Sequence, residues 1–348
     1  MRNRPIHWAA LLAGVLALPF TAAPATAAPA TAAPATAAPA TAAPAAPGDL
    51  RTAPYYMPLD SDPQDIGEAM RASGQKDFVF AFVLAPGAGS CTPTWDGKPG
   101  QEVAADTAVK AKVDAVRQTG GDVSVSFGGY NGIELGAACP DAAALADAYQ
   151  QVIDKYGLTH IDLDIEGDDL GDVPGETKRF AAVKTLKQRN PDLHVTLTLP
   201  MTSVGLNEAG KAEIQRAKDM GAEIDLFKIM DFDYGGPGND MANSAISVAE
   251  AFHRQLRELH PEFDDAAAYA RTGVILMNGH TDQPSELFTQ DTFRALVDYA
   301  EQHRIGRLSY WSMNRDRVCT EPVGWADGKC SSVEQQPYEF TKIVSRYQ

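Results

Sequence analysis

The sequence is poor in cysteine and in positive charge, and each shortage narrows the class of protein. Its 348 residues include only four cysteines, and no two of them stand in a Cys-x-x-Cys spacing, which argues against a metal site. Lysine and arginine number 30 against 46 aspartates and glutamates, for a formal net charge of −16. Because an acidic protein repels nucleic acid and anionic membranes, we expect neither as a partner.

Long apolar stretches and glycine-rich phosphate loops are also absent. The apolar run within residues 8–20 is too short to span a bilayer, and no later stretch is long enough to do so. No Gly-x-Gly-x-x-Gly turn follows an expected strand, which counts against a dinucleotide-binding sheet.

The beginning of the chain has the composition of a targeting segment and not of a fold. Arg2 and Arg4 precede the apolar run, and Ala-x-Ala sites follow it, a pattern typical of a secretory signal peptide. Residues 21–47 repeat Thr-Ala-Ala-Pro-Ala without charge or large apolar side chains. We predict a signal peptide over 1–28, a low-complexity tether over 29–48 and one folded domain over 49–348. A targeting extension is the alternative explanation of the repeats.

The charge and the cysteines of the remaining chain predict a secreted, extracellular protein. Residues 1–48 hold two arginines and no acid, so the rest carries 28 basic and 46 acidic residues, net −18, and we expect a neutral or cationic substrate. Four cysteines in a secreted chain predict two disulfides, for which three connectivities exist. Cys319 and Cys330 bracket a short loop and pair most simply with each other, which leaves Cys91 with Cys139. Metal ligation is the rival interpretation.

Apolar segments alternate with amphipathic ones from residue 54 onward. The predicted strands are rich in aliphatic and aromatic residues and cover 55–59, 78–84, 123–128, 159–166, 194–199, 226–234, 272–277 and 307–312. The predicted helices cover about 63–73, 104–118, 141–156, 176–189, 207–220, 241–259, 289–303 and 337–346. Asp141 can cap a helix that ends at Gly157, and Asn190-Pro191 stops another. Eight strand-then-helix units predict a single-domain α/β fold, the (β/α)8 TIM barrel, with a doubly wound open sheet as the alternative.

The segment Asp162-x-Asp164-x-Glu166 is the strongest functional signal. Its acids alternate with Ile161, Leu163 and Ile165, so on a strand all three carboxylates share one face. One alternative is that the segment is an exposed strand with a polar face and no catalytic function. A calcium-binding EF-hand loop is disfavoured, because Val173 stands where its bidentate glutamate belongs. Crowded carboxylates in a barrel lumen raise at least one pKa, which leaves a protonated acid at neutral pH. Glu166, nearest the open rim, is the expected proton donor, with Asp164 beside it.

Four strand ends resemble one enzyme family. The acid segment looks like the latter part of D-G-x-D-x-D-x-E, the signature of the family 18 glycoside hydrolases, which include chitinases and endo-N-acetylglucosaminidases. Ser126-Phe127-Gly128-Gly129 resembles their S-x-G-G motif, and Met230-Asp231-Phe232-Asp233 resembles M-x-Y-D. Trp311 stands where the family has a tryptophan on its last strand. The resemblance extends from residue 54 to 346.

The chain departs from the family pattern in two places. Thr159 and His160 replace the leading Asp-Gly, a change that we expect to be structural. Phe232 replaces the tyrosine whose hydroxyl helps to hold the substrate, and Tyr234, two residues on, could supply that hydroxyl. The run Met-Asp-Phe-Asp-Tyr-Gly is similar to a bacterial and archaeal chitinase subgroup with M-x-x-D-Y-G.

The resemblance implies substrate-assisted, retaining cleavage of β-1,4 N-acetylglucosamine linkages in chitin or chitooligosaccharides. Glu166 would protonate the glycosidic oxygen, and the substrate's own acetamido group would attack the anomeric carbon. Asp164 would orient that group, and Asp162, bonded to Ser126 and to Tyr55 or Tyr56, would tune Asp164. The implied substrate-binding residues are Asp233, Tyr234, Trp311, Met230, Ser126 and Tyr56.

Other readings of function remain open. An endo-β-N-acetylglucosaminidase acting on N-glycans and a non-hydrolytic chitin-binding lectin share this fold. We expect an endo-acting chitinase that is a monomer and needs no cofactor or metal. Trp95 could stack on a sugar ring or pack within its loop, and His280, Asp282 and Asn131 are further rim candidates.

Overall fold

A computed structural model describes residues 50–321 and 325–348. The predicted signal peptide (1–28) and tether (29–48), together with Asp49, lie outside the described residues. Within the described ranges, no helix is both long enough and apolar enough to cross a bilayer.

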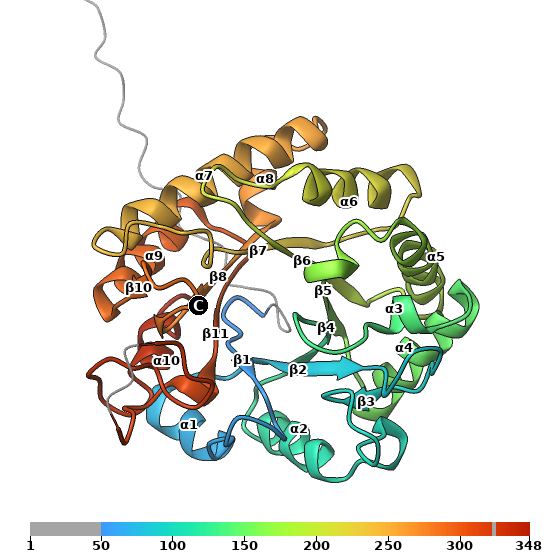
Figure 1. Cartoon of the computed structure of the whole chain (residues 1–348), viewed down its shortest axis with the longest axis horizontal. Helices are drawn as coiled ribbons and strands as arrows, with labels where there is room; N and C mark the ends of the chain where they lie inside the picture. The colour runs from blue at the N-terminus through green and yellow to red at the C-terminus, as the bar shows by residue number, and fades with distance from the viewer. Residues whose placement is uncertain (1–49, 322–324) are drawn as a thin grey trace, which may run out of the picture. The chain divides into compact units, whose positions relative to one another are not determined.

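Eight parallel strands form a barrel, as the sequence predicted, and a ring of helices encloses it (Figure 1). The strands, in spatial and chain order, are β1 (Tyr55–Tyr56), β2 (Phe78–Leu84), β4 (Val123–Gly128), β5 (His160–Asp164), β6 (His194–Pro200), β7 (Leu226–Met230), β8 (Thr272–Met277) and β11 (Arg307–Trp311). The circle closes just before β1, where Leu308 donates its N–H to the carbonyl of Arg51 at 2.8 Å. The fold is therefore a (β/α)8 TIM barrel.

The helices that follow the strands begin and end at recognisable signals. They are α1 (Ile66–Ser73), α2 (Ala108–Gln118), α4 (Ala142–Tyr156), α5 (Val173–Arg189), α6 (Glu208–Asp219), α7 (Met241–Leu259), α9 (Gln290–His303) and α10 (Glu339–Val344). As predicted, Asp141 caps α4 by accepting the N–H of Ala144, and Gly157 ends that helix in the left-handed conformation at φ 60°. Helix α5 likewise ends at Arg189, just before Asn190 and the proline that follows it.

Several short elements were not predicted, because each is too brief to show a period. They are β3 (Thr94–Trp95), the hairpin of β9 (Gly279–His280) with β10 (Leu287–Phe288), α3 (Leu135–Ala138), α8 (Asp265–Ala270), and the 3-10 turns η1 (Val103–Ala105), η2 (Gly167–Asp169) and η3 (Met313–Arg315). Several predicted strands are also shorter than expected, among them 159–166, which is His160–Asp164 in the structure. The predicted 226–234 strand stops at Met230, and the predicted 55–59 strand stops at Tyr56.

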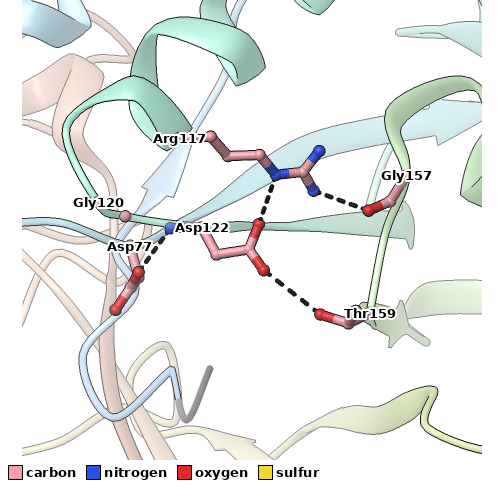
Figure 2. Close-up of a pocket in the computed structure, with 7 residues that line it drawn as sticks. Asp77, Arg117, Gly120, Asp122, Gly157 and Thr159 are labelled. Atoms are coloured by element: carbon pink, nitrogen blue, oxygen red, sulfur yellow. Dashed lines mark hydrogen bonds and ion pairs between the residues drawn. The ribbon is translucent and has the colours of Figure 1, made fainter. Parts of the chain in front are cut away.

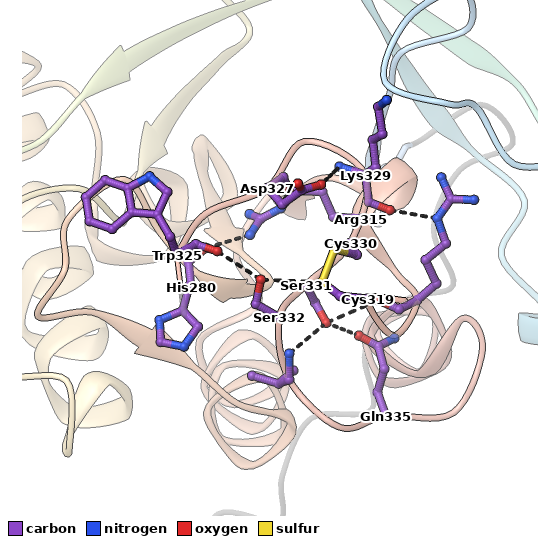
Figure 3. The surroundings of a disulfide bond; sticks show 12 residues. His280, Arg315, Cys319, Trp325, Asp327, Lys329, Cys330, Ser331, Ser332 and Gln335 are labelled. Carbon is purple, nitrogen blue, oxygen red and sulfur yellow. Dashed lines mark hydrogen bonds between the residues drawn. A yellow bond between two sulfur atoms is a disulfide. The ribbon is translucent and has the colours of Figure 1, made fainter. Parts of the chain in front are cut away.

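Both predicted disulfides are present. Cys91 bonds Cys139 across the loops after β2 and β4, and Cys319 bonds Cys330 after η3. Beside the second disulfide, Arg315 donates to the carbonyl oxygens of Asp327 at 2.8 Å and of His280 at 2.5 Å (Figure 3). The loop after β11 is thereby fastened to the loop after β8, on the carboxyl-terminal rim of the barrel.

Candidate active site

Strand β5 places the acid row in the barrel lumen. Ile161 and Leu163 are fully buried on the helix-facing side, so the period of two turns Asp162 and Asp164 inward. Neighbouring strands lie in register with them, since Ser126 of β4 is paired with Asp162, and Thr198 of β6 with Asp164. The predicted row therefore exists as a lumen-facing feature.

Asp162 is the deepest member and is fully satisfied. Its Oδ2 accepts hydrogen bonds from the hydroxyls of Tyr55 at 2.8 Å and Ser126 at 2.7 Å. Its Oδ1 accepts from the Thr198 hydroxyl at 2.7 Å and lies 3.1 Å from the Nζ of Lys228. Burial by itself would raise the pKa of Asp162, but the Lys228 charge and the three hydroxyls outweigh burial and lower it. Asp162 is therefore an ionised carboxylate.

Asp164, in contrast to Asp162, has few hydrogen-bond partners and a raised pKa. It is 3% exposed, its Oδ1 has no hydrogen-bond partner among the described residues, and its Oδ2 shares the Tyr55 hydroxyl at a longer 3.3 Å. Burial, followed by the charges of Glu166 and Asp162, raises the pKa of Asp164 well above its ordinary value. Of the two aspartates, Asp164 is therefore the one that favours the protonated form.

Glu166 stands at the mouth of the lumen. It follows the last residue of β5 by two positions, and its extended backbone (φ −133°, ψ 172°) continues the alternation of the strand. Its side chain is part-buried. Burial, followed by the negative charge of Asp233, raises the pKa of Glu166 to about 7. A carboxyl group with this pKa can donate a proton near neutral pH.

The Ser-x-Gly-Gly segment at the end of β4 provides a hydrogen bond to the acid row and allows β4 and β5 to approach closely. Ser126 bonds Asp162, as described, whereas Gly128 and Gly129 allow β4 to approach the end of β5. A Cβ on Gly128 would lie 2.0 Å from the carbonyl oxygen of Asp164, and both glycines have positive φ, 107° and 91°. The Gly129 N–H donates to that same oxygen at 2.9 Å. The glycines thus fix the backbone that carries Asp164.

The segment after β7 is shaped by a residue that sequence reasoning missed. The buried carboxylate of Glu286 accepts backbone N–H groups from Asp233, Tyr234, Gly235 and Gly236, at 2.8, 3.0, 2.8 and 2.9 Å respectively. Three residues after the end of β7, Asp233 adopts a left-handed backbone (φ 60°), and its negative charge acts on Glu166. No sequence signal marked Glu286, because it stands in an irregular loop 50 residues from its partners.

The prediction that Tyr234 supplies the missing hydroxyl stays a prediction. The Tyr234 hydroxyl is buried and has no hydrogen-bond partner among the described residues. Burial, followed by the negative charge of Asp231, raises the pKa of Tyr234. The left-handed turn at Asp233 breaks the strand alternation on which the prediction depended. Met230 and Phe232 instead present buried apolar side chains at this strand end.

Of the two tyrosines predicted as partners of Asp162, Tyr55 bonds it and Tyr56 does not. The Tyr56 hydroxyl donates to the carbonyl of Gln64 at 2.7 Å and accepts from Lys112, outside the lumen. Tyr55, on the opposite face of β1, reaches both aspartates. The Trp311 ring, only partly buried, lies 5.7 Å from the Tyr55 ring between centroids, which places the predicted tryptophan beside the row.

Of the remaining rim candidates, Trp95 can be assigned. It is fully buried and its indole N–H donates to the Tyr156 hydroxyl at 2.8 Å, so it packs within its loop and cannot stack on a ligand. Asn131 is exposed and His280 part-exposed on the carboxyl-terminal rim. Tyr130, which the sequence did not single out, is 75% exposed with its ring 3.9 Å from the Cβ position of Gly167. It therefore flanks Glu166.

A depression of about 550 Å³ lies at the opposite end of the barrel, where β2, β4 and β5 begin (Figure 2). Asp122 accepts there from the Nε of Arg117 at 2.8 Å and from the Thr159 hydroxyl at 3.3 Å, and donates its N–H to Asp77 at 2.7 Å. These groups pair with one another and hold the strand starts together. In TIM barrels chemistry takes place at the carboxyl-terminal face, so we assign the active site to the acid row.

Two curated proteins are similar to most of the domain. The chain is 31% identical over 278 residues to the "Probable bifunctional chitinase/lysozyme" of Escherichia coli K12, covering 76% of this chain and 30% of that protein. It is 31% identical over 252 residues to "Endochitinase 11" of Metarhizium anisopliae, covering 69% of this chain and 47% of that protein. The chain thus spans less than half the length of each of these relatives.

A solved structure is similar over its whole length. The catalytic domain of the hyperthermophilic chitinase from Pyrococcus furiosus superimposes with a TM-score of 0.75 at 29% identity, covering 85% of this chain and 94% of that one. No family model matches the chain.

The fold and site together define a TIM-barrel enzyme with an acid–base centre at the carboxyl ends of its strands. Within that class, the comparisons place it plainly: the chain belongs to the family 18 glycoside hydrolases.

Proposed function

We propose that the protein is a secreted, endo-acting chitinase that hydrolyses β-1,4 N-acetylglucosamine linkages in chitin or chitooligosaccharides. The observation that carries the proposal is the acid row in the barrel lumen, in which Asp162 is bonded by three hydroxyls, Asp164 is buried beside it and Glu166 lies part-buried at the mouth. The names of the similar proteins, which include two chitinases and an endochitinase, support the same substrate and mode of cleavage.

Glu166 acts as the general acid in this proposal. It is the only member of the row at the mouth, and its pKa of about 7 keeps much of it protonated under neutral conditions. Proton transfer to the glycosidic oxygen lets the leaving sugar depart as a neutral alcohol, and such catalysis contributes about 10²–10⁴-fold.

The substrate itself provides the nucleophile. Asp164 is a poor nucleophile because it is buried and its pKa is raised. Asp162 is ionised, but it lies deep in the lumen with both oxygens bonded, so the row offers no ionised carboxylate placed to act as the nucleophile of the two-carboxylate retaining scheme. The acetamido carbonyl oxygen of the bound sugar would attack the anomeric carbon and give a cyclic oxazolinium ion with net retention. Asp164 would accept a hydrogen bond from the acetamido N–H as that group becomes positively charged, its proton passing toward Asp162.

Aromatic and polar side chains around Glu166 suit a neutral sugar chain. Trp311 supplies a partly exposed ring beside Tyr55, and Tyr130 an exposed ring beside Gly167, as flat surfaces for pyranose rings. Asp233 can accept from a sugar hydroxyl or the acetamide. Met230, buried at the end of β7, would line the lumen next to the acetamido methyl group.

One assay tests the proposal. Chitin, chitooligosaccharides and an N-glycosylated protein are incubated with the protein, and the products are identified by mass. We expect short oligomers of N-acetylglucosamine from the first two substrates. Glu166→Gln should lower turnover by at least about 100-fold while oligosaccharide affinity and the melting temperature stay near wild type. Wild-type turnover in this variant would reject Glu166 as the acid, and products from the glycoprotein alone would favour an endoglycosidase.

A non-hydrolytic chitin-binding protein is the second candidate. The observation that favours it is Phe232, which follows β7 at the position where the family pattern has a tyrosine hydroxyl. Binding to chitin without any released product would establish this candidate.

Export and the domain limits are part of the proposal. The basic and apolar start of the chain and the two disulfides support a cleaved signal peptide over 1–28, a tether over 29–48 and a catalytic domain over 49–348, acting as a monomer. Amino-terminal sequencing of protein from the culture medium would locate the cleavage site, and light scattering would give the oligomeric state.

A further inference from the structure

Lys228 is a buried cation directly beneath the acid row. It stands in the middle of β7, is 1% exposed, and its Nζ lies 3.1 Å from Asp162 Oδ1 and 4.5 Å from the centroid of the Tyr55 ring. The contact with Asp162 is a charge pair and does not have hydrogen-bond geometry, so Lys228 acts on Asp162 through its charge. Burying an ammonium group costs several kcal/mol, which a lysine in an ordinary apolar core would not repay.

The neighbouring strand is adapted to the lysine. Gly273 of β8 lies beside Lys228 in the parallel register. A Cβ at Gly273 would stand 2.9 Å from the Cγ of Lys228 and 3.1 Å from its Cβ. The room for the lysine stem thus depends on the absence of a side chain at position 273, and the position of its charge is fixed by the fold.

The charged groups around Lys228 come from three other strands. Asp162 and Asp164 face it from β5 and Tyr55 from β1, and the positive charge of Arg307 on β11 acts against it. The three groups that donate to Asp162 are hydroxyls of neutral side chains. Lys228 is therefore the cation that sets which aspartate of the pair is ionised, at the 3.1 Å contact with Asp162.

We propose that Lys228 is a positioning residue that fixes Asp162 as the carboxylate and so leaves the proton of the Asp162–Asp164 pair on Asp164. The Tyr55 hydroxyl supports this difference in charge between the two aspartates, because it lies closer to Asp162, at 2.8 Å, than to Asp164, at 3.3 Å. This inference rests on the proposed function and deepens it, since it states how the resting row is charged before the substrate binds.

The proposal fixes the sign of a pH effect. The charge of Lys228 lowers the pKa of both aspartates. The pair must hold a single proton, because Asp164 can pass its proton to Asp162 only while Asp162 is a carboxylate. Removing the charge raises both pKa values, so the carboxylate form is reached only at higher pH. The acid limb of the kcat–pH profile should then move to higher pH.

Lys228→Met, which keeps the length of the side chain and removes its charge, is the test variant. We expect its acid limb to move up by about one pH unit or more, and kcat on the acid side to fall about tenfold per unit. Lys228→Arg should restore the wild-type limb in part. Lys187→Met is the matched control, because Lys187 pairs with Asp225 at 2.5 Å outside the lumen, and its acid limb should stay at the wild-type position.

A second readout does not depend on turnover. In ¹³Cγ-aspartate NMR, the Asp162 resonance is identified by its loss in Asp162→Asn and followed from about pH 3 to pH 8. We expect Asp162 to remain ionised below its ordinary pKa in the wild type, and to titrate above that value in Lys228→Met. Circular dichroism verifies that each variant is folded.

The two readouts separate the possible failures. If the wild-type protein releases no sugar, but Asp162 titrates at higher pH in Lys228→Met, the proposed function is rejected and the inference is kept. If the wild type is active and Lys228→Met is folded, but the acid limbs of their kcat–pH profiles coincide, the inference is overturned. If Lys228→Met does not fold, the wild-type spectrum decides alone, because titration of Asp162 above its ordinary pKa with Lys228 in place contradicts the proposal.

Discussion

At the scale of single residues, the acid row shows how three similar side chains acquire three different charge states. Asp162 is surrounded by donors and a cation, Asp164 by other acids, and Glu166 lies part-buried near the charge of Asp233. The chemical groups are nearly the same, so the difference comes from position along β5. Depth in the lumen decides how many donors reach each carboxylate.

The alkaline limb of the activity profile should therefore belong to Glu166. As the pH rises through about 7, Glu166 loses its proton and kcat/KM should fall. Asp233→Asn removes a negative charge that raises the pKa of Glu166, so the limb should move to lower pH. Measuring kcat/KM on a chromogenic chitooligosaccharide across pH 4–9 tests this. A limb that stays in place in Asp233→Asn would show that the two acids are not coupled.

At the scale of elements, the loop after β7 depends on one carboxylate. Glu286 accepts four consecutive backbone N–H groups, and an additional bond from the Thr281 hydroxyl at 3.0 Å. In Glu286→Gln the amide nitrogen would face donors, leaving buried N–H groups unsatisfied at a cost of about 1–3 kcal/mol. We expect a lower free energy of unfolding in urea and a reduced kcat/KM, because Asp233 is displaced. The exposed Glu301→Gln is the control, with neither quantity changed; an unchanged Glu286→Gln would contradict the role.

The disulfides should differ in their contribution to stability. Cys91–Cys139 joins residues 48 apart in the sequence, and Cys319–Cys330 residues 11 apart. In the chain-entropy account, the longer loop stabilises by about 1.3 kcal/mol more. Replacing each pair by alanine and measuring urea denaturation should show this order. Equal losses would indicate that native-state contacts, and not loop closure, dominate.

The sequence allows prediction of features that depend on short-range pattern. The acid row, Ser126 and the helix caps follow from the period of two or from local chemistry, and the structure contains each of them. The choice between Tyr55 and Tyr56 as the partner of Asp162 stayed open, because the pattern of residues 55–59 does not reveal which face is inward. The placement of Tyr234 relied on strand alternation, which the left-handed Asp233 interrupts. Lys228 was not predicted, although a lone cation in an apolar strand is a signal that could have marked it, whereas Glu286 is tied to its partners only through tertiary structure.

At the scale of the whole molecule, buried acids should shift maximal stability toward mildly acidic pH. Burial raises the pKa of Asp77 and Asp169 to about 6 and that of Glu213 to about 8. A carboxyl group whose pKa is raised on folding stabilises fully below its unfolded pKa and loses that contribution as pH rises to the folded value. At the acid end, Glu262, with a pKa lowered to about 2, loses its contribution as the pH falls toward 2.

We therefore expect the melting temperature to be highest between about pH 4.5 and pH 6 and to decline toward pH 8.5. Calorimetry in buffers of constant ionic strength measures this directly. Glu213→Gln should flatten the decline between about pH 5 and pH 8, since it removes the group with the highest of these values. A melting temperature that rises steadily from pH 5 to pH 8.5 would contradict the assignment.

The closure of the barrel has a practical consequence for handling the protein. The described chain enters at the amino-terminal end of the strands, where Arg307 donates to the carbonyl of Leu50 at 2.7 Å and Leu308 to that of Arg51. Glu166 lies at the other end. In a chain shortened to begin at Leu50, a bead or fluorophore attached to that residue would therefore lie at the end of the barrel opposite Glu166, so immobilised protein could still take up a long polymer from solution.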